Sequence, residues 1–374
     1  MDSVGGAKKL LWASEWIEHQ TKYTVQNIMN CTLDTWAVSV ADFPAAGTPV
    51  EQMEFLLNYA VLAPSNHNTQ PWLFEIHGEA IHLFADRTRA LPMTDPEDRE
   101  LIISCGAALF HLRVAMRHFG VLGPVETFPD PTKPDWLARL ELGSGNENYP
   151  EETLLFHAIP KRRTNRQPFQ DDPLPEPVLG ALREVAQQEH AWLNYVQGDA
   201  NRQVLAALIA EADCLQWADK RFRREVAAWV HPNRSVSHDG IPGSAAGLGN
   251  LVSLAGPSII RTFNMGAGRA ARDQEIALGS PVLALLQTDA DVPPAWLAAG
   301  QALARVLLRA RVEDVWASFL NQPIEVAELR PRICELVGKT GYPQILLRLG
   351  FGQTVPPTPR RPVDEVCHIR GEVS

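Results

Sequence analysis

Two prolines bracket a short polar segment, Ala63-Pro64-Ser65-Asn66-His67-Asn68-Thr69-Gln70-Pro71-Trp72. Residues 53–61 carry apolar side chains at helical spacing, and that helix must end before Pro64, because the residue before a proline is pushed out of the α region. Residues 72–77 and 80–85 flank Gly78 and predict the two strands of a hairpin. The bracketed segment is therefore predicted as a rigid turn between a helix and a strand, rich in side chains that donate and accept hydrogen bonds.

Hydrophobic periodicity predicts alternating helices and strands over the rest of the chain. We expect helices near residues 101–116, 178–188, 201–230 and 295–310, and strands at 192–196 and 281–286, with a Pro- and Gly-rich connection at 120–150. Residues 238–271 contain seven glycines and few charges, so they are predicted as a long irregular, lid-like segment. Residues 1–48 are interpreted as an N-terminal extension.

Two of the predicted helices hint at an internal repeat. Cys105-Gly106-Ala107-Ala108-Leu109 aligns with Ala299-Gly300-Gln301-Ala302-Leu303, matching a glycine, an alanine and a leucine, and each helix follows an apolar strand. Three identities are weak by themselves, and they gain weight only if other features also divide the chain into two halves.

The charge balance and the cysteines exclude several classes of protein. With 34 Lys and Arg against 44 Asp and Glu, the net charge of −10 disfavours nucleic-acid binding, which needs clustered cations. The five cysteines are dispersed and form no CxxC pair, and the eleven histidines show no metal-binding spacing, so neither a disulfide framework nor a metal site is expected. No apolar run is long enough for a membrane span. The default expectation is a cytoplasmic protein without membrane or nucleic-acid partners.

Arginines cluster at two positions against this acidic background. Lys161-Arg162-Arg163-Thr164-Asn165-Arg166 places four cations in six residues, and Thr358-Pro359-Arg360-Arg361-Pro362 holds an arginine pair between prolines. Guanidinium groups match phosphate oxygens in a bidentate geometry, so a phosphate site is one interpretation and a solvated basic turn is the other. Gly266-Ala267-Gly268-Arg269-Ala270-Ala271 mimics a dinucleotide motif, but the residues before it make a poor strand.

These motifs together resemble the nitroreductase superfamily. The bracketed turn resembles the segment of that superfamily that contacts flavin mononucleotide (FMN), and Arg162–Arg166 resembles its Arg-Arg-Ser-x-Arg phosphate motif. Residues 343–350 with 359–366 resemble its C-terminal signature. A closer match, to the Acg-type proteins with two halves in one chain, rests on Arg89-Ala90-Leu91-Pro92, Asp95-Pro96, Arg99-Glu100-Leu101 and residues 103–109.

The resemblance implies an α+β fold in which a nitroreductase-like unit, with mixed central sheets packed by helices, is duplicated as a pseudo-dimer. The expected division is residues 1–48, an extension; 49–155, a first half; and 156–374, a second half that includes the lid-like segment 238–271. The turn lies in the first half and both arginine motifs lie in the second. A counterpart of either motif is missing where a second site would need it, so one FMN per chain is expected, in a monomer or a weak dimer.

The resemblance also implies roles for single residues. The expected contacts of the isoalloxazine ring are Pro64, Ser65, Asn66, Asn68 and Gln70; those of the phosphate are Arg162, Arg163, Thr164, Arg166 and Arg360, with Arg361 less certain. The flavin N5 then carries hydride from NAD(P)H to a nitroaromatic, quinone or similar small molecule, and no side chain is required as a nucleophile or general base. If the lid-like segment closes over the ring, the alternative is an FMN-sequestering protein with little turnover.

Overall fold

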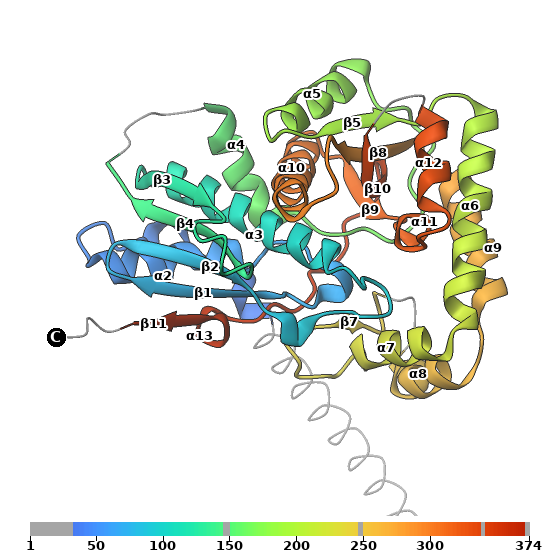
Figure 1. Ribbon diagram of the computed structural model, residues 1–374, viewed down its shortest axis with the longest axis horizontal. Helices are drawn as coiled ribbons and strands as arrows, with labels where there is room; N and C mark the ends of the chain where they lie inside the picture. The colour runs from blue at the N-terminus through green and yellow to red at the C-terminus, as the bar shows by residue number, and fades with distance from the viewer. Residues whose placement is uncertain (1–32, 145–149, 246–249, 338–340, 371–374) are drawn as a thin grey trace, which may run out of the picture.

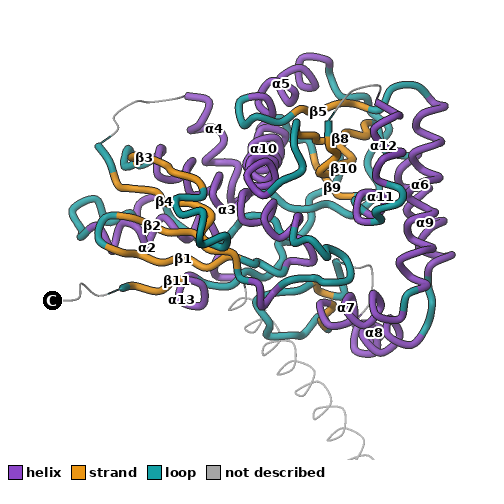
Figure 2. Tube along the Cα trace, in the orientation of Figure 1, coloured by secondary structure: helices purple, strands orange, loops and turns teal. Residues whose placement is uncertain are grey.

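The computed structural model describes residues 33–144, 150–245, 250–337 and 341–370 (Figure 1). Two sheets lie on either side of a pair of central helices, and a column of further helices flanks the second sheet (Figure 2). The predicted extension 1–48 is described only from residue 33 onward, so most of it lies outside the described residues. Within the described part, no helix is long and apolar enough to cross a membrane.

The first sheet contains the predicted hairpin. β1 (Trp72–His77) pairs antiparallel with β2 (Ala80–Ala85), joined by a two-residue turn in which Gly78 has a φ of +59°. The sheet order is β11-β1-β2-β4-β3, with β4 (Trp136–Leu142) and β3 (Leu122–Thr127) antiparallel and β11 (Cys367–Ile369) parallel to β1. The Pro- and Gly-rich connection predicted at 120–150 therefore contains two strands. Apolar residues at alternate positions, such as Ala138 and Leu140, both fully buried, outweigh the turn residues around them.

The second sheet repeats the order of the first. β5 (Trp192–Tyr195), β8 (Val282–Thr288), β10 (Tyr342–Gly350) and β9 (Trp316–Phe319) are arranged β5-β8-β10-β9, all antiparallel. β5, β8, β9 and β10 thus occupy the same relative positions in the second sheet as β1, β2, β3 and β4 do in the first. The prediction of an α+β fold duplicated in one chain is confirmed, with the qualification that only the first sheet mixes parallel and antiparallel pairs.

The two matched helices of the sequence repeat pack against each other at the centre of the molecule (Figure 1). α3 (Arg99–His118) follows β2, and α10 (Pro293–Val312) follows β8 at the equivalent place in the second half. Gly106 and Gly300, which the sequence alignment superimposes, face each other across this interface: a Cβ atom on Gly106 would lie 3.0 Å from the Cα of Gly300. The helices therefore approach as closely as their backbones allow, which only glycine permits.

Smaller helices cover the two sheets. α2 (Pro49–Ala60) begins with a capping box, in which the Thr48 hydroxyl accepts from the Glu51 amide and the Glu51 carboxylate accepts from the Thr48 amide. α4 (Pro150–Ala158) and α5 (Glu176–Gln187) pack against α10. The main core is continuous through both halves, from Met53 and Trp72 of the first to Leu286 and Leu347 of the second.

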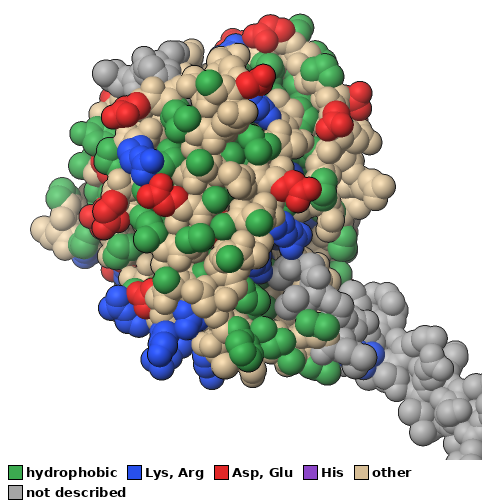
Figure 3. Space-filling view, turned by 90° about the vertical axis from the view of Figure 1, so that its right-hand side faces the viewer, with side chains coloured by type: hydrophobic (Ala, Val, Ile, Leu, Met, Phe, Trp, Pro, Cys, Tyr) green, Lys and Arg blue, Asp and Glu red, His purple; other side chains and the backbone are tan. Residues whose placement is uncertain are grey.

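A large excursion, residues 196–281, separates β5 from β8 where the first half has only its two-residue hairpin turn. It contains α6 (Asp199–Ala218), α7 (Lys220–Trp229), β6 (Val230–His231), β7 (Ile241–Pro242), α8 (Asn250–Thr262) and α9 (Gly266–Leu278). The prediction that 238–271 is irregular is wrong for most of that segment. Four of its seven glycines precede Asn250, so α8 and α9 together contain only the other three. The outer face of this excursion intersperses charged and hydrophobic side chains (Figure 3).

The C-terminal segment returns from the second half to the first. α11 (Gln322–Glu325) and α12 (Arg330–Val337) lie between β9 and β10. After β10 the chain crosses to α13 (Val363–Val366), and β11 then forms an edge strand of the first sheet. Phe74 of β1 is in register with Cys367 of β11. This crossing brings the arginine pair at 360–361 to the bracketed turn.

We expect Gly300→Ala to lower the free energy of unfolding by about 1–3 kcal/mol, because its Cβ would lie 2.8 Å from the Cα of Gly106 and overpack the interface. Chemical denaturation measures the change. Gly180→Ala in α5 is the matched control: nothing lies within 4 Å of its added Cβ, so we expect a gain of about 0.5–1 kcal/mol. Equal effects of the two substitutions would contradict a glycine-dependent interface.

Candidate active site

Two adjoining cavities lie where the first half meets the second. The larger has a volume of about 290 Å³ and the smaller about 30 Å³. Both are lined by residues of the first half, the second half and the excursion, and the residues they share are Pro64, Ser65, Thr164, Arg166 and Ile241. The bracketed turn and the first arginine motif, far apart in sequence, therefore meet at one place.

The bracketed turn adopts an unusual backbone. His67, Asn68 and Gln70 all have positive φ, at 47°, 57° and 50°. Such conformations cost about 1–2 kcal/mol per residue for side chains other than glycine, and they persist where surrounding contacts hold them. Ser65 provides two of these contacts: its hydroxyl accepts from the Gln70 amide at 2.9 Å, and its carbonyl accepts from the Asn68 amide at 3.1 Å.

The polar side chains of the turn point in different directions. Asn66 lines the larger cavity and donates to the Glu100 carboxylate at 2.6 Å. Asn68 lines the smaller cavity, where its amide donates to the Gly240 carbonyl at 3.0 Å and its oxygen accepts from Arg360 at 2.8 Å. Gln70 is fully buried and lines neither cavity; it donates to the His238 carbonyl at 2.8 Å and accepts from the Arg361 amide at 2.7 Å. Pro64, Ser65 and Asn66 are therefore placed to contact a ligand in the larger cavity, and Gln70 braces the turn.

His67 lines the larger cavity, and its ring nitrogen Nδ1 has no hydrogen-bond partner among the described residues. Burial, followed by the nearby charge of Arg166, lowers the pKa of His67 to about 4. The imidazole is therefore neutral at pH 7 and available to accept or donate one hydrogen bond to a ligand.

Four arginines converge on the smaller cavity, two of them buried and two partly exposed. Arg162, Arg163, Arg166 and Arg360 line it together with Thr164. Arg162 is 2% exposed and Arg360 is 4% exposed, and the Nε atoms of both have no hydrogen-bond partner. The partners they do have are neutral, for example the Leu62 carbonyl for Arg162 at 3.2 Å and the Thr358 hydroxyl for Arg360 at 2.6 Å. Among the described residues, no carboxylate lies within ion-pair distance of these four side chains.

This concentration of positive charge is electrostatically costly. Burial lowers the pKa of Arg162 to about 9, with a further contribution from Arg163. Burial also holds the pKa of Arg360 well below its usual range, and Arg162, Arg163 and Arg166 lower it further by repulsion. A bound anion would relieve both effects, since it would supply the missing charge and the missing acceptors.

Arg361 differs from its neighbour. It lines neither cavity, donates to the Gln70 carbonyl at 3.2 Å and the Glu365 carbonyl at 2.8 Å, and lies 3.9 Å from the Asp86 carboxylate. The structure therefore brings Arg360 to the smaller cavity and leaves Arg361 in a local network of acids and carbonyls.

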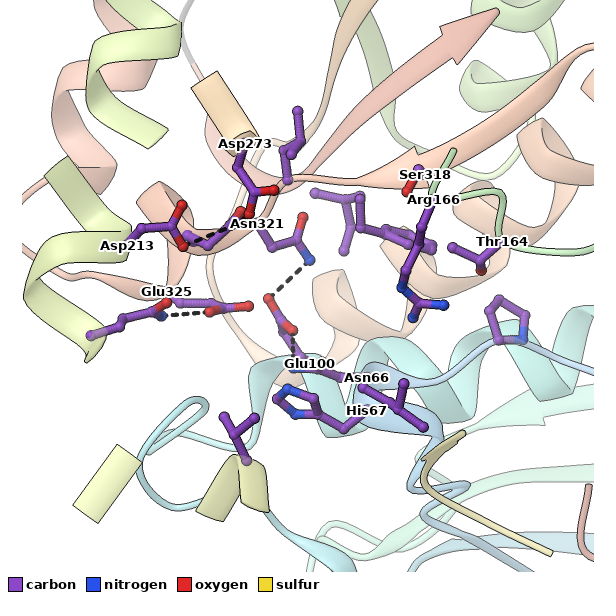
Figure 4. A pocket seen from close by; sticks show the side chains of 18 of the residues that line it. Asn66, His67, Glu100, Thr164, Arg166, Asp213, Asp273, Ser318, Asn321 and Glu325 are labelled. Atoms are coloured by element: carbon purple, nitrogen blue, oxygen red, sulfur yellow. Dashed lines mark hydrogen bonds between the residues drawn. The ribbon is translucent and has the colours of Figure 1, made fainter. Parts of the chain in front are cut away.

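The far end of the larger cavity is lined by acids that the sequence patterns did not indicate. Figure 4 shows Thr164 and Arg166 on one side and Asp213, Asp273 and Glu325 on the other, with Glu100 between Asn66 and Asn321. Asn321 donates to Glu100 at 3.2 Å and accepts from the Leu346 amide at 2.9 Å, so it links the two halves. Burial raises the pKa of Glu100 to about 7, and burial together with Asp273 raises that of Asp213 to about 7.

These acids come from α3, α6, α9 and α11, and each helix contributes one carboxylate to the larger cavity. Only the packing of these helices brings them together.

The excursion covers one side of the site. Ile241 and Ala245 line the larger cavity, as do Asp273 and Ile276 of α9. Residues 238–240 are fastened to the bracketed turn by the hydrogen bonds of Asn68 and Gln70, and Asp239 forms an ion pair with Arg89. The lid-like role predicted for 238–271 therefore corresponds to a structured cover held by the turn it covers.

In the part of the second half that the structure describes, no equivalent turn is present. In the second half, the connection that corresponds to the bracketed turn joins α5 to β5 and comprises only residues 188–191, without a proline. Pro257 and Ser258, the nearest sequence match to the start of the motif, lie inside α8. Glu189, a buried residue of the 188–191 connection, forms ion pairs with Arg113 of α3 at 2.7 Å and Arg305 of α10 at 3.0 Å.

Several known proteins similar to this chain are nitroreductases by name. "Putative NAD(P)H nitroreductase Rv3131" of Mycobacterium tuberculosis is 33% identical over 331 residues, covering 84% of this chain and 91% of that protein. "Putative NAD(P)H nitroreductase acg" of the same organism is 32% identical over 320 residues, covering 84% and 94%. "Probable NAD(P)H nitroreductase PigM" of a Serratia species is 23% identical over 347 residues, covering 83% and 91%.

No protein-family model matches the sequence. Among solved structures, a "putative nitroreductase from anabaena variabilis" aligns with 82% of this chain and 88% of its own, at 10% identity and a TM-score of 0.43. The argument rests on the mycobacterial relatives, whose identity extends over nearly their whole length. The chain belongs to the nitroreductase family, to which the Acg relative also belongs by name.

Proposed function

We propose that the chain is an FMN-dependent oxidoreductase that takes hydride from NAD(P)H and passes it to a nitroaromatic, quinone or similar small acceptor. The observation that carries the proposal is the smaller cavity, which adjoins a larger cavity lined by the bracketed turn. Four arginines line the smaller cavity, two of them buried, and none has a carboxylate partner among the described residues. The names of the relatives, as NAD(P)H nitroreductases, support the reaction class.

The side chains of the site fit a flavin phosphate. The unpartnered Nε atoms of Arg162 and Arg360 are buried donors that require an acceptor, and a phosphate monoester supplies acceptors and two negative charges. Thr164 adds a hydroxyl beside them. Arg163 and Arg166 complete the set, so these five residues would hold the phosphate, and Pro64, Ser65, Asn66 and Asn68 would line the ring and its linker.

FMN, when bound, supplies hydride transfer, and the protein has only to bind, orient and shield it. Asn66 is held by Glu100 and by the Ser104 hydroxyl, which accepts from the Asn66 amide at 3.3 Å. The neutral His67 offers a hydrogen bond at the cavity wall without adding charge. The excursion limits the access of water from one side.

The second candidate is an FMN-sequestering protein with little turnover. Two observations favour it. Residues 238–245 cover one side of the site, and the volume of the larger cavity, about 290 Å³, lies at the lower end of the sizes typical of ligand pockets. A nicotinamide or nitroaromatic would then need the cover to open. The two candidates share the same cofactor site and differ only in whether that opening occurs.

We also propose the division 1–48, 49–155 and 156–374, with one FMN per chain, in a cytoplasmic monomer or weak dimer. The repeated sheet order supports the two halves, and the short 188–191 connection supports a single site.

We predict one FMN per chain and a monomer by light scattering, because the halves already bury the interface that separate subunits would share. The ratio of flavin absorbance to protein concentration measures the first. A ratio near two, or a stable dimer whose flavin is lost on dilution, would contradict the proposal.

The phosphate assignment predicts that Arg162→Ala combined with Arg166→Ala purifies with little flavin. Two lost charge-assisted hydrogen bonds amount to about 3 kcal/mol or more, roughly a hundredfold in affinity. Visible absorbance of the purified variant measures the retained FMN. Arg183→Ala is the control, since Arg183 lies on α5 and pairs with the exposed Glu176 at 3.1 Å. Full flavin in the double variant would show the assignment to be wrong.

Anaerobic mixing with NADH or NADPH separates the two candidate functions. We expect the enzyme to lose its flavin colour within seconds and to regain it when a quinone or nitroaromatic is added. A flavin that only dithionite reduces would reject the oxidoreductase and leave the sequestering protein. The Arg89→Ala variant, which releases Asp239 of the cover, should accelerate reduction if the cover is what limits access.

A further inference from the structure

Trp36 lies beside the smaller cavity although it belongs to the extension, for which the sequence suggested no role. It ends a single 3₁₀ turn, Asp34–Trp36. The guanidinium of Arg163 stacks on its ring at 3.6 Å from the ring centre, and that of Arg360 lies 5.0 Å from the same point. One indole ring therefore contacts two of the four arginines that line the smaller cavity.

Trp36 also holds the segment that delivers Arg360. Its indole Nε1 donates to the Thr358 carbonyl at 2.8 Å. The Thr358 hydroxyl in turn accepts from Arg360 at 2.6 Å, and Thr358 itself lines the smaller cavity. The extension, the first arginine motif and the C-terminal segment thus meet at this side chain.

An aromatic ring solves an electrostatic problem that a carboxylate would not. Arg162, Arg163 and Arg166 repel Arg360, and an ion pair with Asp or Glu would relieve the repulsion. That ion pair would also cancel the positive potential that attracts phosphate. The face of an indole ring attracts two cations while carrying no net charge, so the potential survives.

We propose that Trp36 is a positioning residue of the phosphate site, which holds Arg163 and Arg360 ready for the phosphate and thereby makes the protein prefer FMN to riboflavin. This inference rests on the proposed function, because it assigns the smaller cavity to the flavin phosphate. It also gives the extension a role: the extension supplies part of the cofactor site.

Fluorescence titration of the whole chain with FMN and, separately, with riboflavin tests the proposal. We expect Trp36→Ala to weaken FMN binding about tenfold, the size expected for losing a partly desolvated cation–π contact, and to leave riboflavin binding unchanged. Trp36→Phe keeps an aromatic face, although a smaller one, and loses the indole N–H, so it should retain most of the affinity and stay within about threefold of the original chain.

Trp136→Ala is the matched control. Trp136 also contacts a cation, with the Lys133 ammonium 5.4 Å from its ring centre, but it lies in β4 of the first sheet and lines neither cavity. We expect its affinities for both flavins to match those of the original chain. Equal losses for FMN and riboflavin in Trp36→Ala would mean a general structural role and overturn the inference.

The outcomes also separate this inference from the proposed function. If the original chain binds riboflavin as tightly as FMN, the phosphate assignment fails, and the inference falls with it. If the original chain prefers FMN and Trp36→Ala keeps the same preference, the inference alone fails. Loss of the preference in Trp36→Ala, with recovery in Trp36→Phe, supports both.

Discussion

The backbone contact between Gly106 and Gly300 is the constraint on which the rest of the molecule depends. It sets how closely α3 and α10 approach, and each of these helices is packed against the sheet of its own half. Because the bracketed turn precedes α3 and the first arginine motif precedes the second sheet, the same contact determines how the two groups of ligand-facing side chains meet. The contact between α3 and α10 thus sets the relative position of the two halves, which together form one site.

The two halves have diverged most at the loop between their first two strands. The first half joins β1 to β2 with two residues, whereas the second inserts residues 196–281 between β5 and β8. That excursion supplies the acidic wall of the larger cavity from α6 and α9, and it supplies the cover that is hydrogen-bonded to Asn68 and Gln70. The second half therefore departs from the symmetry of the duplicated fold, and the inserted residues line and cover the larger cavity.

The sequence revealed the local features of the fold and the site well. The helix, turn and hairpin of residues 49–85 follow from proline placement and alternating hydrophobicity, which act over a few residues. Within the excursion, the helices predicted over 201–230 are present, but 238–271 was wrongly predicted as irregular because glycines averaged over that segment concealed two helices. Asn321, Asp213 and Trp36 escaped notice for a different reason: each is unremarkable in its own segment, and only long-range packing brings it to the site. The direction in which Gln70 points likewise depends on partners more than 160 residues away.

The pairing of β11 with β1 has a consequence for how the molecule is made. Phe74 aligns with Cys367, so the edge of the first sheet stays open until nearly all of the described chain has been synthesised. Arg360 travels on the same segment, and it reaches Asn68 only when this late strand docks. Closing so long a loop is slow, because its entropy must be lost before the contact is gained. A nascent chain therefore exposes a template edge and an incomplete anion pocket together, and both are closed by one final event.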